Sequence, residues 1–231
     1  MNIRVNGIDL HYEEIGRGST IIFLHGNSED MSIFSDAVGY FMGDHRCITV
    51  DSRGHGSSEW GTERLTIPLL ADDILKFIEA KELDDVTLIG FSDGGNIALE
   101  VASVSERIRG LIVVGANLRP DGLTASTRFY ITIARALCLP FSFIPSMVRM
   151  RRRYGLMSHQ PPITSEKLSR ITARTLVVAG TKDMVKTPHT EEIYGNIRSA
   201  SIKLFEGRGH FLFKSDRDEL LGVIREFTES L

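Results

Sequence analysis

Ser92 lies between two glycines in the segment LIGFSDGGNIALEVA, after an apolar run and before a pattern typical of a helix. Reversing the chain direction within so few residues forces the serine into a strained backbone conformation, and only small neighbours leave room for that turn. The turn presents the serine hydroxyl at the carboxyl end of a strand, over the first unpaired amides of a helix. This arrangement predicts a nucleophile that attacks a carbonyl carbon. The alternative interpretation is a serine that caps the helix.

A serine hydroxyl is a weak nucleophile at neutral pH, so it requires a base and a group that orients the base. Asp183 follows the apolar run TLVVAG, and His210 follows the run SIKLFEG in a loop before the last helical pattern. Both side chains are expected at the edge of the sheet where Ser92 lies. Taken singly, such residues are usually structural. Their joint placement predicts a catalytic triad of Ser92, His210 and Asp183.

The negative oxygen that forms on the attacked carbonyl requires hydrogen-bond donors. His25, Gly26 and Asn27 follow the apolar run IIFL, and the glycine lets the backbone approach closely. We therefore expect the backbone N–H groups of Asn27 and Asp93 to form an oxyanion hole. His25 and the turn at residues 51–56 carry further titratable side chains, which we expect to brace their loops rather than to move protons.

The elements that must position these residues show in the hydrophobic pattern. Short β-branched runs begin at residues 21, 47, 86, 111, 175 and 201 and alternate with helical patterns such as Ile67 to Ala80. Continuous apolar runs suit strands buried on both faces, so the fold class is predicted as α/β, a mostly parallel sheet with helices on both sides. Two earlier strands, near NIRVN and IDLHYEE, lie too close together for a helical crossover and are expected to form an antiparallel hairpin.

A single domain is expected over residues 1–231, because a chain of 231 residues with 42% hydrophobic content suffices for one sizeable core. The rhythm of strands and helices breaks at about residues 118–173, where two strand patterns are separated by more chain than one crossover helix requires. We interpret this segment as an insertion that forms a short helical cap over the site.

Within that insertion, Phe129 to Val148 approaches the length of a membrane-spanning helix. Arg135 lies inside this run, and Pro140 and Pro145 interrupt it, so we expect a folded apolar flap and no stable membrane insertion. Residues 119–174 contain ten Lys and Arg against two acids, whereas the rest of the chain contains 17 against 28. This basic segment is interpreted either as a solvated face that balances an acidic body or as an entrance that attracts anionic substrates.

Composition limits the partners. A formal net charge of −3 gives no reason to expect nucleic acid. The two cysteines, Cys47 and Cys138, have neither the number nor the spacing of a disulfide framework or a metal site. We predict no metal and no cofactor. The start of the chain, MNIRVNGIDL, lacks an apolar leader, and a cytoplasmic location is expected. A homodimer is left open.

The chain resembles the α/β-hydrolase superfamily, in particular its small esterases, lactonases and peroxidase-like members. The resemblance rests on LHGN, DSRGHGSS, GFSDGGNIAL, the aspartate after TLVVAG, and GRGHF, and it covers everything outside residues 118–173. It implies a hydrolase in which Ser92 is the nucleophile, His210 the general base and acid, and Asp183 its partner. The implied substrate is a small-molecule carboxylic ester, thioester or lactone, with an activated amide left open, cleaved through an acyl-enzyme.

Two alternatives stay open beside the esterase: a carbon–carbon bond hydrolase with the same triad, and a non-catalytic receptor or binding module. Haloalkane dehalogenases and epoxide hydrolases of this fold use an aspartate nucleophile, and Ser92 occupies that position here. The sequence Ser-Asp-Gly-Gly is also similar to that of valacyclovir-hydrolase-like enzymes, which implies that the Asp93 carboxylate holds the ammonium of an amino-acid ester. The structural alternative is a negative charge that favours the helix dipole.

Overall fold

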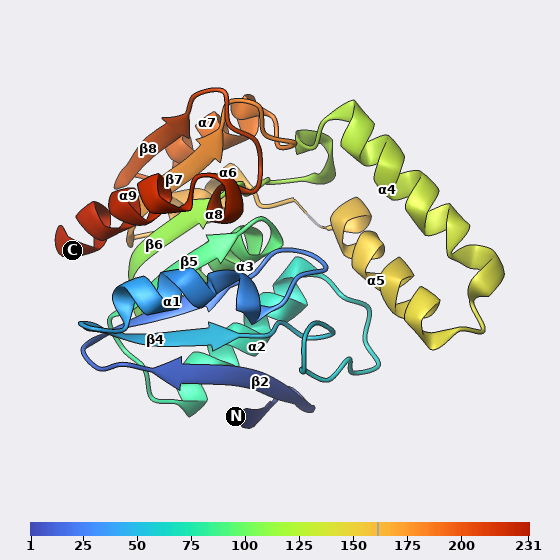
Figure 1. Cartoon of the computed structure of the whole chain (residues 1–231), viewed down its shortest axis with the longest axis horizontal. Helices are drawn as coiled ribbons and strands as arrows, with labels where there is room; N and C mark the ends of the chain where they lie inside the picture. The colour runs from blue at the N-terminus through green and yellow to red at the C-terminus, as the bar shows by residue number, and fades with distance from the viewer. Residues whose placement is uncertain (161) are drawn as a thin grey trace.

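The computed structural model describes residues 1–160 and 162–231, so Pro161, which belongs to the predicted insertion, lies outside the described residues. The central sheet has eight strands in the order β1-β2-β4-β3-β5-β6-β7-β8 (Figure 1). Their bounds are β1 Asn2–Val5, β2 Ile8–Ile15, β3 Ser19–Leu24, β4 His45–Val50, β5 Val86–Phe91, β6 Ile108–Val114, β7 Arg174–Gly180 and β8 Ala200–Phe205.

β1 and β2 form the expected antiparallel hairpin, with Val5 opposite Ile8. Asn6 and Gly7 make the two-residue turn with φ angles of 43° and 73°, which is the conformation that Asn-Gly favours in a tight hairpin. β2 also runs antiparallel to β4. The pairs from β4 to β8 are all parallel. The carboxyl ends of these six strands therefore meet at one edge of the sheet.

Helices cover both faces of the sheet (Figure 1). One layer contains α1 (Ser35–Phe41), α8 (Leu212–Ser215), α9 (Arg217–Glu229) and the 3-10 helix η1 (Met31–Phe34); the other contains α2 (Ile67–Ala80), α3 (Asp93–Ala102) and α7 (Thr187–Asn196). Successive side chains of a strand point to opposite faces. Accordingly, Ile22 and Leu24 of β3 pack in one core and Ile21 and Phe23 in the other. Burial on both faces explains the continuous apolar runs.

Between β6 and β7 the chain forms a helical hairpin. The segment contains the 3-10 helix η2 (Pro120–Gly122), α4 (Ala125–Leu137), the 3-10 helix η3 (Leu139–Phe141), α5 (Pro145–His159) and α6 (Ser165–Ser169). The hairpin itself is formed by α4 and α5, whereas α6 packs against α7. α4 and α5 lie side by side and project beyond the edge of the sheet, at the right of Figure 1. Large apolar side chains stay exposed there, such as Phe129 at 70% and Phe143 at 79%. Among the described residues, every helix is too short or too polar to cross a membrane.

Candidate active site

Ser92 connects β5 to α3 in a strained conformation. Its φ of 54° and ψ of −119° lie outside the regions that residues with a side chain usually adopt. Two backbone hydrogen bonds hold the turn: the Ser92 amide donates to the Val114 carbonyl at 2.8 Å, and the Asn96 amide donates to the Ser92 carbonyl at 3.1 Å. The Ser92 side chain makes no capping hydrogen bond to α3, so the capping interpretation does not hold.

Glycines make this turn possible. A Cβ at Gly90 would lie 2.3 Å from the Gly94 carbonyl oxygen, and a Cβ at Gly94 would lie 2.0 Å from the Leu24 carbonyl oxygen. Both distances are far shorter than any van der Waals contact allows. The small neighbours inferred from the sequence are therefore a steric requirement of the way β3, β5 and α3 pack.

The structure brings the three predicted triad side chains together in one hydrogen-bonded chain. Ser92 Oγ lies 3.0 Å from His210 Nε2, and His210 Nδ1 lies 2.7 Å from Asp183 Oδ1. Asp183 follows β7, and His210 belongs to the loop after β8, so both come from the carboxyl edge of the sheet. His210 and Asp183 are buried, at 7% and 8% exposure. Asp183 Oδ1 also accepts a hydrogen bond from the Val185 amide at 2.8 Å, which fixes the carboxylate.

Gly115, directly after β6, makes room for the histidine. A Cβ there would lie 2.9 Å from the His210 ring and 3.3 Å from Asp183 Oδ2, and the φ of Gly115 is 64°. Gly115 is not among the residues predicted from the sequence, although the glycine in the run LIVVGA is a usable signal. Any side chain at this position would displace the imidazole from Ser92.

The segments that carry the two predicted oxyanion amides are joined by a side-chain contact. Asn27 Nδ2 donates to Asp93 Oδ2 at 2.9 Å and to the Arg153 carbonyl at 3.0 Å. A Cβ at Gly26 would lie only 3.1 Å from Ser92 Cβ. The loop after β3 therefore passes directly over the serine, and Asn27 links it to α5 as well.

The Asp93 carboxylate is used inside the protein. Its side chain accepts hydrogen bonds from Asn27 and, at 3.3 Å, from Asn96 Nδ2, and the residue is only 5% exposed. Burial raises the pKa of Asp93, and the contact with Asn27 partly offsets that effect. Asp93 is not among the described residues that line the cavity beside Ser92. These contacts favour the structural interpretation over a substrate-binding carboxylate.

Asp93→Asn is therefore expected to change kcat/KM by a similar small factor, within about threefold, for neutral esters and for amino-acid esters of equal size. One of the two amide contacts must reverse, which we expect to lower the free energy of unfolding by about 1 kcal/mol. Paired kinetics with alanine and propionate esters, together with thermal melting, measure both effects. A loss of tenfold or more that is confined to the alanine ester would return Asp93 to the substrate site.

His25 and His55 hold loops in place, as expected for His25 and for the turn at residues 51–56. His25 Nδ1 lies 2.8 Å from the Gly26 carbonyl, and its Nε2 accepts a hydrogen bond from the Ser52 amide at 3.1 Å. His55 Nδ1 lies 3.1 Å from the Arg53 carbonyl. Burial lowers the pKa of both, that of His55 to about 3. Both rings are therefore neutral at physiological pH. His25 joins the turn at residues 51–56 to the loop after β3, and His55 holds the turn itself.

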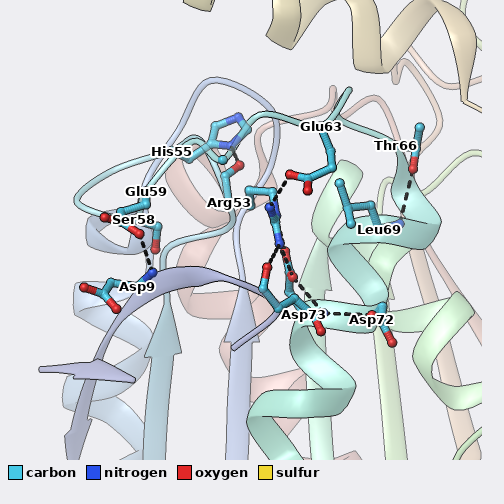
Figure 2. Close-up of polar contacts among 12 residues, drawn as sticks. Asp9, Arg53, His55, Ser58, Glu59, Glu63, Thr66, Leu69, Asp72 and Asp73 are labelled. Atoms are coloured by element: carbon cyan, nitrogen blue, oxygen red, sulfur yellow. Dashed lines mark hydrogen bonds and ion pairs between the residues drawn. The ribbon is translucent and has the colours of Figure 1, made fainter. Parts of the chain in front are cut away.

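A buried ion pair holds the same turn. Figure 2 shows the Arg53 guanidinium between Asp73 on α2 and Glu63. Arg53 donates from Nε and Nη2 to the two Asp73 oxygens, each at 2.7 Å, and the two side chains are 1% and 2% exposed. Removing one partner of such a pair leaves a buried charge uncompensated. The charges of this turn thus brace it, in agreement with the expectation from the sequence.

The densest part of the basic segment contacts the body of the protein. Arg149, Arg152 and Arg153 of α5 place their guanidinium carbons 5.6, 5.1 and 5.2 Å from the ring centroid of Trp60. Arg153 also donates to the Gly54 carbonyl at 2.9 Å. These arginines fasten the α4–α5 hairpin over the sheet edge, which is a third role beside the two interpretations considered for the sequence.

A cavity of about 190 Å³ lies against Ser92 and His210. Both helices of the hairpin contribute to its wall, and most of the surrounding side chains are aromatic, aliphatic or thioether groups. The lining residues are Gly26, Asn27, Ser28, Glu29, Phe91, Ser92, Thr127, Tyr130, Ile131, Tyr154, Met157, Met184, His210 and Phe211. In the described part of the chain, no cluster of three or more His, Cys, Asp or Glu suits a metal ion.

Known proteins share this architecture. A model of the Alpha/beta hydrolase family matches residues 21–223. AB hydrolase superfamily protein YisY of Bacillus subtilis (strain 168) is 26% identical over 262 residues, covering 96% of each chain. An esterase, EaEST from Exiguobacterium antarcticum, superposes with a TM-score of 0.81 at 23% identity, covering 97% of each chain. Est816, described as an N-acyl homoserine lactone degrading enzyme, has a TM-score of 0.80 at 23% identity, covering 98% of this chain and 100% of the other. The predicted fold class is confirmed.

Proposed function

Because this chain belongs to the alpha/beta hydrolase family, we propose that it is a serine hydrolase that cleaves a small carboxylic ester, thioester or lactone through an acyl-enzyme. The observation that carries the proposal is the hydrogen-bonded chain from Ser92 Oγ through His210 to Asp183, at 3.0 and 2.7 Å. The apolar cavity against Ser92 supplies room for an acyl group.

In the first half-reaction, His210 Nε2 accepts the hydroxyl proton while Ser92 Oγ bonds to the carbonyl carbon. Asp183 holds the ring through Nδ1–H and stabilises the imidazolium that forms. The backbone N–H groups of Asn27 and Asp93 donate to the carbonyl oxygen as it becomes negative. When the tetrahedral intermediate collapses, the bond to the leaving group breaks and His210 returns the proton to that group. The acyl group remains on Ser92.

In the second half-reaction, water takes the place of the serine. His210 Nε2 accepts a proton from water while its oxygen attacks the acyl carbon, and the same amides hold the oxyanion. The bond to Ser92 Oγ then breaks, and His210 protonates the serine. A carboxylic acid leaves, and the enzyme returns to its initial protonation state.

A fluorophosphonate probe and a panel of p-nitrophenyl esters test this function together. The probe reports a reactive serine, and we expect mass spectrometry to locate one phosphonyl group on Ser92. Hydrolysis of the esters should be suppressed in proportion to labelling, because the same hydroxyl performs both reactions. A folded protein that neither labels nor hydrolyses any ester would contradict the proposal and favour a non-catalytic binding module.

The cavity dimensions indicate a short acyl group. Its volume of about 190 Å³ is below the range of roughly 300–1,000 Å³ typical of sites for drug-sized ligands. A second apolar groove of about 370 Å³ lies between α4 and α5, and Tyr130 and Tyr154 line both spaces. Their hydroxyl oxygens are 3.3 Å apart. The two rings therefore stand as a wall between the site and the groove.

Tyr154→Ala is expected to move the preference toward longer acyl chains. Removing the ring joins the two spaces, and each methylene buried there contributes up to about 0.8 kcal/mol. We expect the ratio of kcat/KM for octanoate over butyrate esters to rise by about tenfold. Tyr154→Phe keeps the ring and serves as the matched control, with a ratio close to that of the wild type. An unchanged ratio in Tyr154→Ala would show that the wall does not limit chain length.

A further inference from the structure

Glu29 is an acidic side chain beside the nucleophile that the proposed mechanism does not use. It follows the loop that carries Asn27, and of the described residues that line the cavity it is the one with a carboxyl group. A Cβ at Gly26 would lie 2.9 Å from Glu29 Oε2 and 3.1 Å from Ser92 Cβ. The distance between Glu29 Oε2 and Ser92 Cβ therefore cannot exceed the sum of these two distances.

One oxygen of this carboxylate has no donor. Glu29 Oε2 is buried and accepts no hydrogen bond within residues 1–160 and 162–231. Glu29 Oε1 lies 3.6 Å from Lys214 Nζ, beyond hydrogen-bond distance, and the Lys214 side chain is 64% exposed. The Glu29 side chain itself is 14% exposed. Burial raises the pKa of Glu29, and the positive charge of Lys214 and the nearby backbone N–H of Gly26 only partly offset that effect.

The contrast with Asp93 shows why Glu29 matters. Asp93 is also buried beside Ser92, but its two oxygens accept hydrogen bonds from Asn27 and Asn96. A buried acceptor without a donor costs about 1–3 kcal/mol, and more when it is charged. A bound molecule that donates a hydrogen bond to Glu29 Oε2 removes this free-energy cost, whereas a molecule without a donor does not.

The charge around the site restricts the kind of donor. Residues 122–165 contain six arginines and no acid, and both helices of this segment contribute to the cavity wall. None of these six arginines is among the residues that line the cavity, so their positive field acts on a ligand as it approaches and disfavours a cation, whereas an anionic ligand is repelled by Glu29 itself. A neutral hydroxyl group avoids both repulsions, because it donates a hydrogen bond to the carboxylate and has no net charge.

We propose that Glu29 is a specificity-determining residue that accepts a hydrogen bond from a hydroxyl group of the substrate, so that the enzyme prefers neutral hydroxylated esters. The inference rests on the proposed function of Ser92. The hydroxyl belongs either to the acyl part, as in a hydroxyacyl ester, or to the leaving alcohol, as in a glycol monoester. In both cases it must lie a few bonds from the ester carbonyl, because Oε2 and Ser92 are so close.

Matched ester pairs test the proposal through a ratio. On the acyl side, 3-hydroxybutyrate and butyrate esters are compared; on the leaving side, 2-hydroxyethyl butyrate and propyl butyrate. We expect the wild type to prefer the hydroxylated member of one pair by about tenfold or more in kcat/KM, the effect of a hydrogen bond to a charged group. Glu29→Leu should reduce this ratio to near one, and Glu29→Gln should give an intermediate ratio. Glu191→Gln removes an exposed carboxylate that is not among the residues lining the cavity, so it is the control and should keep the wild-type ratio.

A pair of phosphonate probes that differ by one hydroxyl gives the same ratio from the rate of Ser92 labelling, without turnover. If the folded wild-type protein shows neither labelling of Ser92 nor hydrolysis of any ester, the proposed function is overturned. Hydrolysis of plain esters with no hydroxyl preference in either pair, or a preference that survives Glu29→Leu, would overturn the role of Glu29 alone. A stronger preference for an ammonium than for a hydroxyl at the same position would overturn the neutral class of substrate.

Discussion

Ser92→Ala is expected to abolish ester hydrolysis while the protein remains folded. The substitution removes Oγ and its 3.0 Å contact with His210 Nε2, and among the described residues that line the cavity no other hydroxyl is hydrogen-bonded to a base. Loss of the serine of a triad lowers kcat by up to about a millionfold, leaving the acceleration that binding and oxyanion stabilisation provide. Steady-state kinetics with p-nitrophenyl butyrate measure the loss.

Circular dichroism and thermal melting supply the control for that variant. Ser92 makes no side-chain capping bond to α3, and its backbone bonds to Val114 and Asn96 do not involve Oγ. Alanine therefore preserves the turn, and the melting temperature should stay within a few degrees of the wild type. Activity near the wild-type level in the folded variant would rule out the acyl-enzyme mechanism.

The order of the triad along the chain could be derived from the sequence because parallel strands impose it. Ser92, Asp183 and His210 each follow an apolar run, and the carboxyl ends of parallel strands meet at one edge of a sheet. Ser92 and His210 are more than a hundred positions apart in the sequence. The three residues nevertheless meet, because each follows a strand that ends at the same edge of the sheet. The alternation of strands and helices predicted the α/β fold for the same reason.

Contacts that depend on the packing of distant loops left no such signal. Trp60 lies in a loop, and nothing in its neighbourhood indicates that three arginines of α5 stack around it. Glu29 lies in the loop after β3 that carries Asn27, but only the structure shows that its carboxylate lines the cavity beside Ser92. For Asp93 the local similarity pointed to the substrate, whereas the contacts with Asn27 and Asn96 point to the protein. In a loop, unlike a helix or strand, the directions of the side chains do not follow a regular sequence period, so the sequence does not predict them.

For the basic segment, the number of charged residues and their contacts in the structure lead to different interpretations. A surplus of positive charge over residues 119–174 indicated either a solvated face or an anion-attracting entrance. In the structure, Arg152 and Arg153 donate to backbone carbonyls of the turn and loop at residues 54–63. Part of the charge therefore connects the hairpin to the body of the protein.

His210→Ala is expected to be about as damaging as Ser92→Ala, because base and nucleophile act as a unit and their losses do not add. Asp183→Asn should lower kcat by about 10⁴-fold, since an amide can donate to the imidazole and stabilise the wrong tautomer. The double variant of Ser92 and His210 should therefore lose little more than either single variant. Single-turnover kinetics with an activated ester measure the chemical step in each case.

The other histidines provide the decisive comparison for that base. His189 Nδ1 accepts a hydrogen bond from the Leu118 amide at 3.4 Å, and His159 Nδ1 lies 3.3 Å from Arg135 on the exposed side of the hairpin. His55 is held neutral by burial, which lowers its pKa to about 3. Replacing any of these three by alanine should alter stability and leave the chemical rate of the folded enzyme within a few-fold of the wild type. If one of them proves essential to the chemical step while His210→Ala retains it, then the proton is carried by another ring, and the 3.0 Å contact between His210 and Ser92 serves only to hold the serine in place.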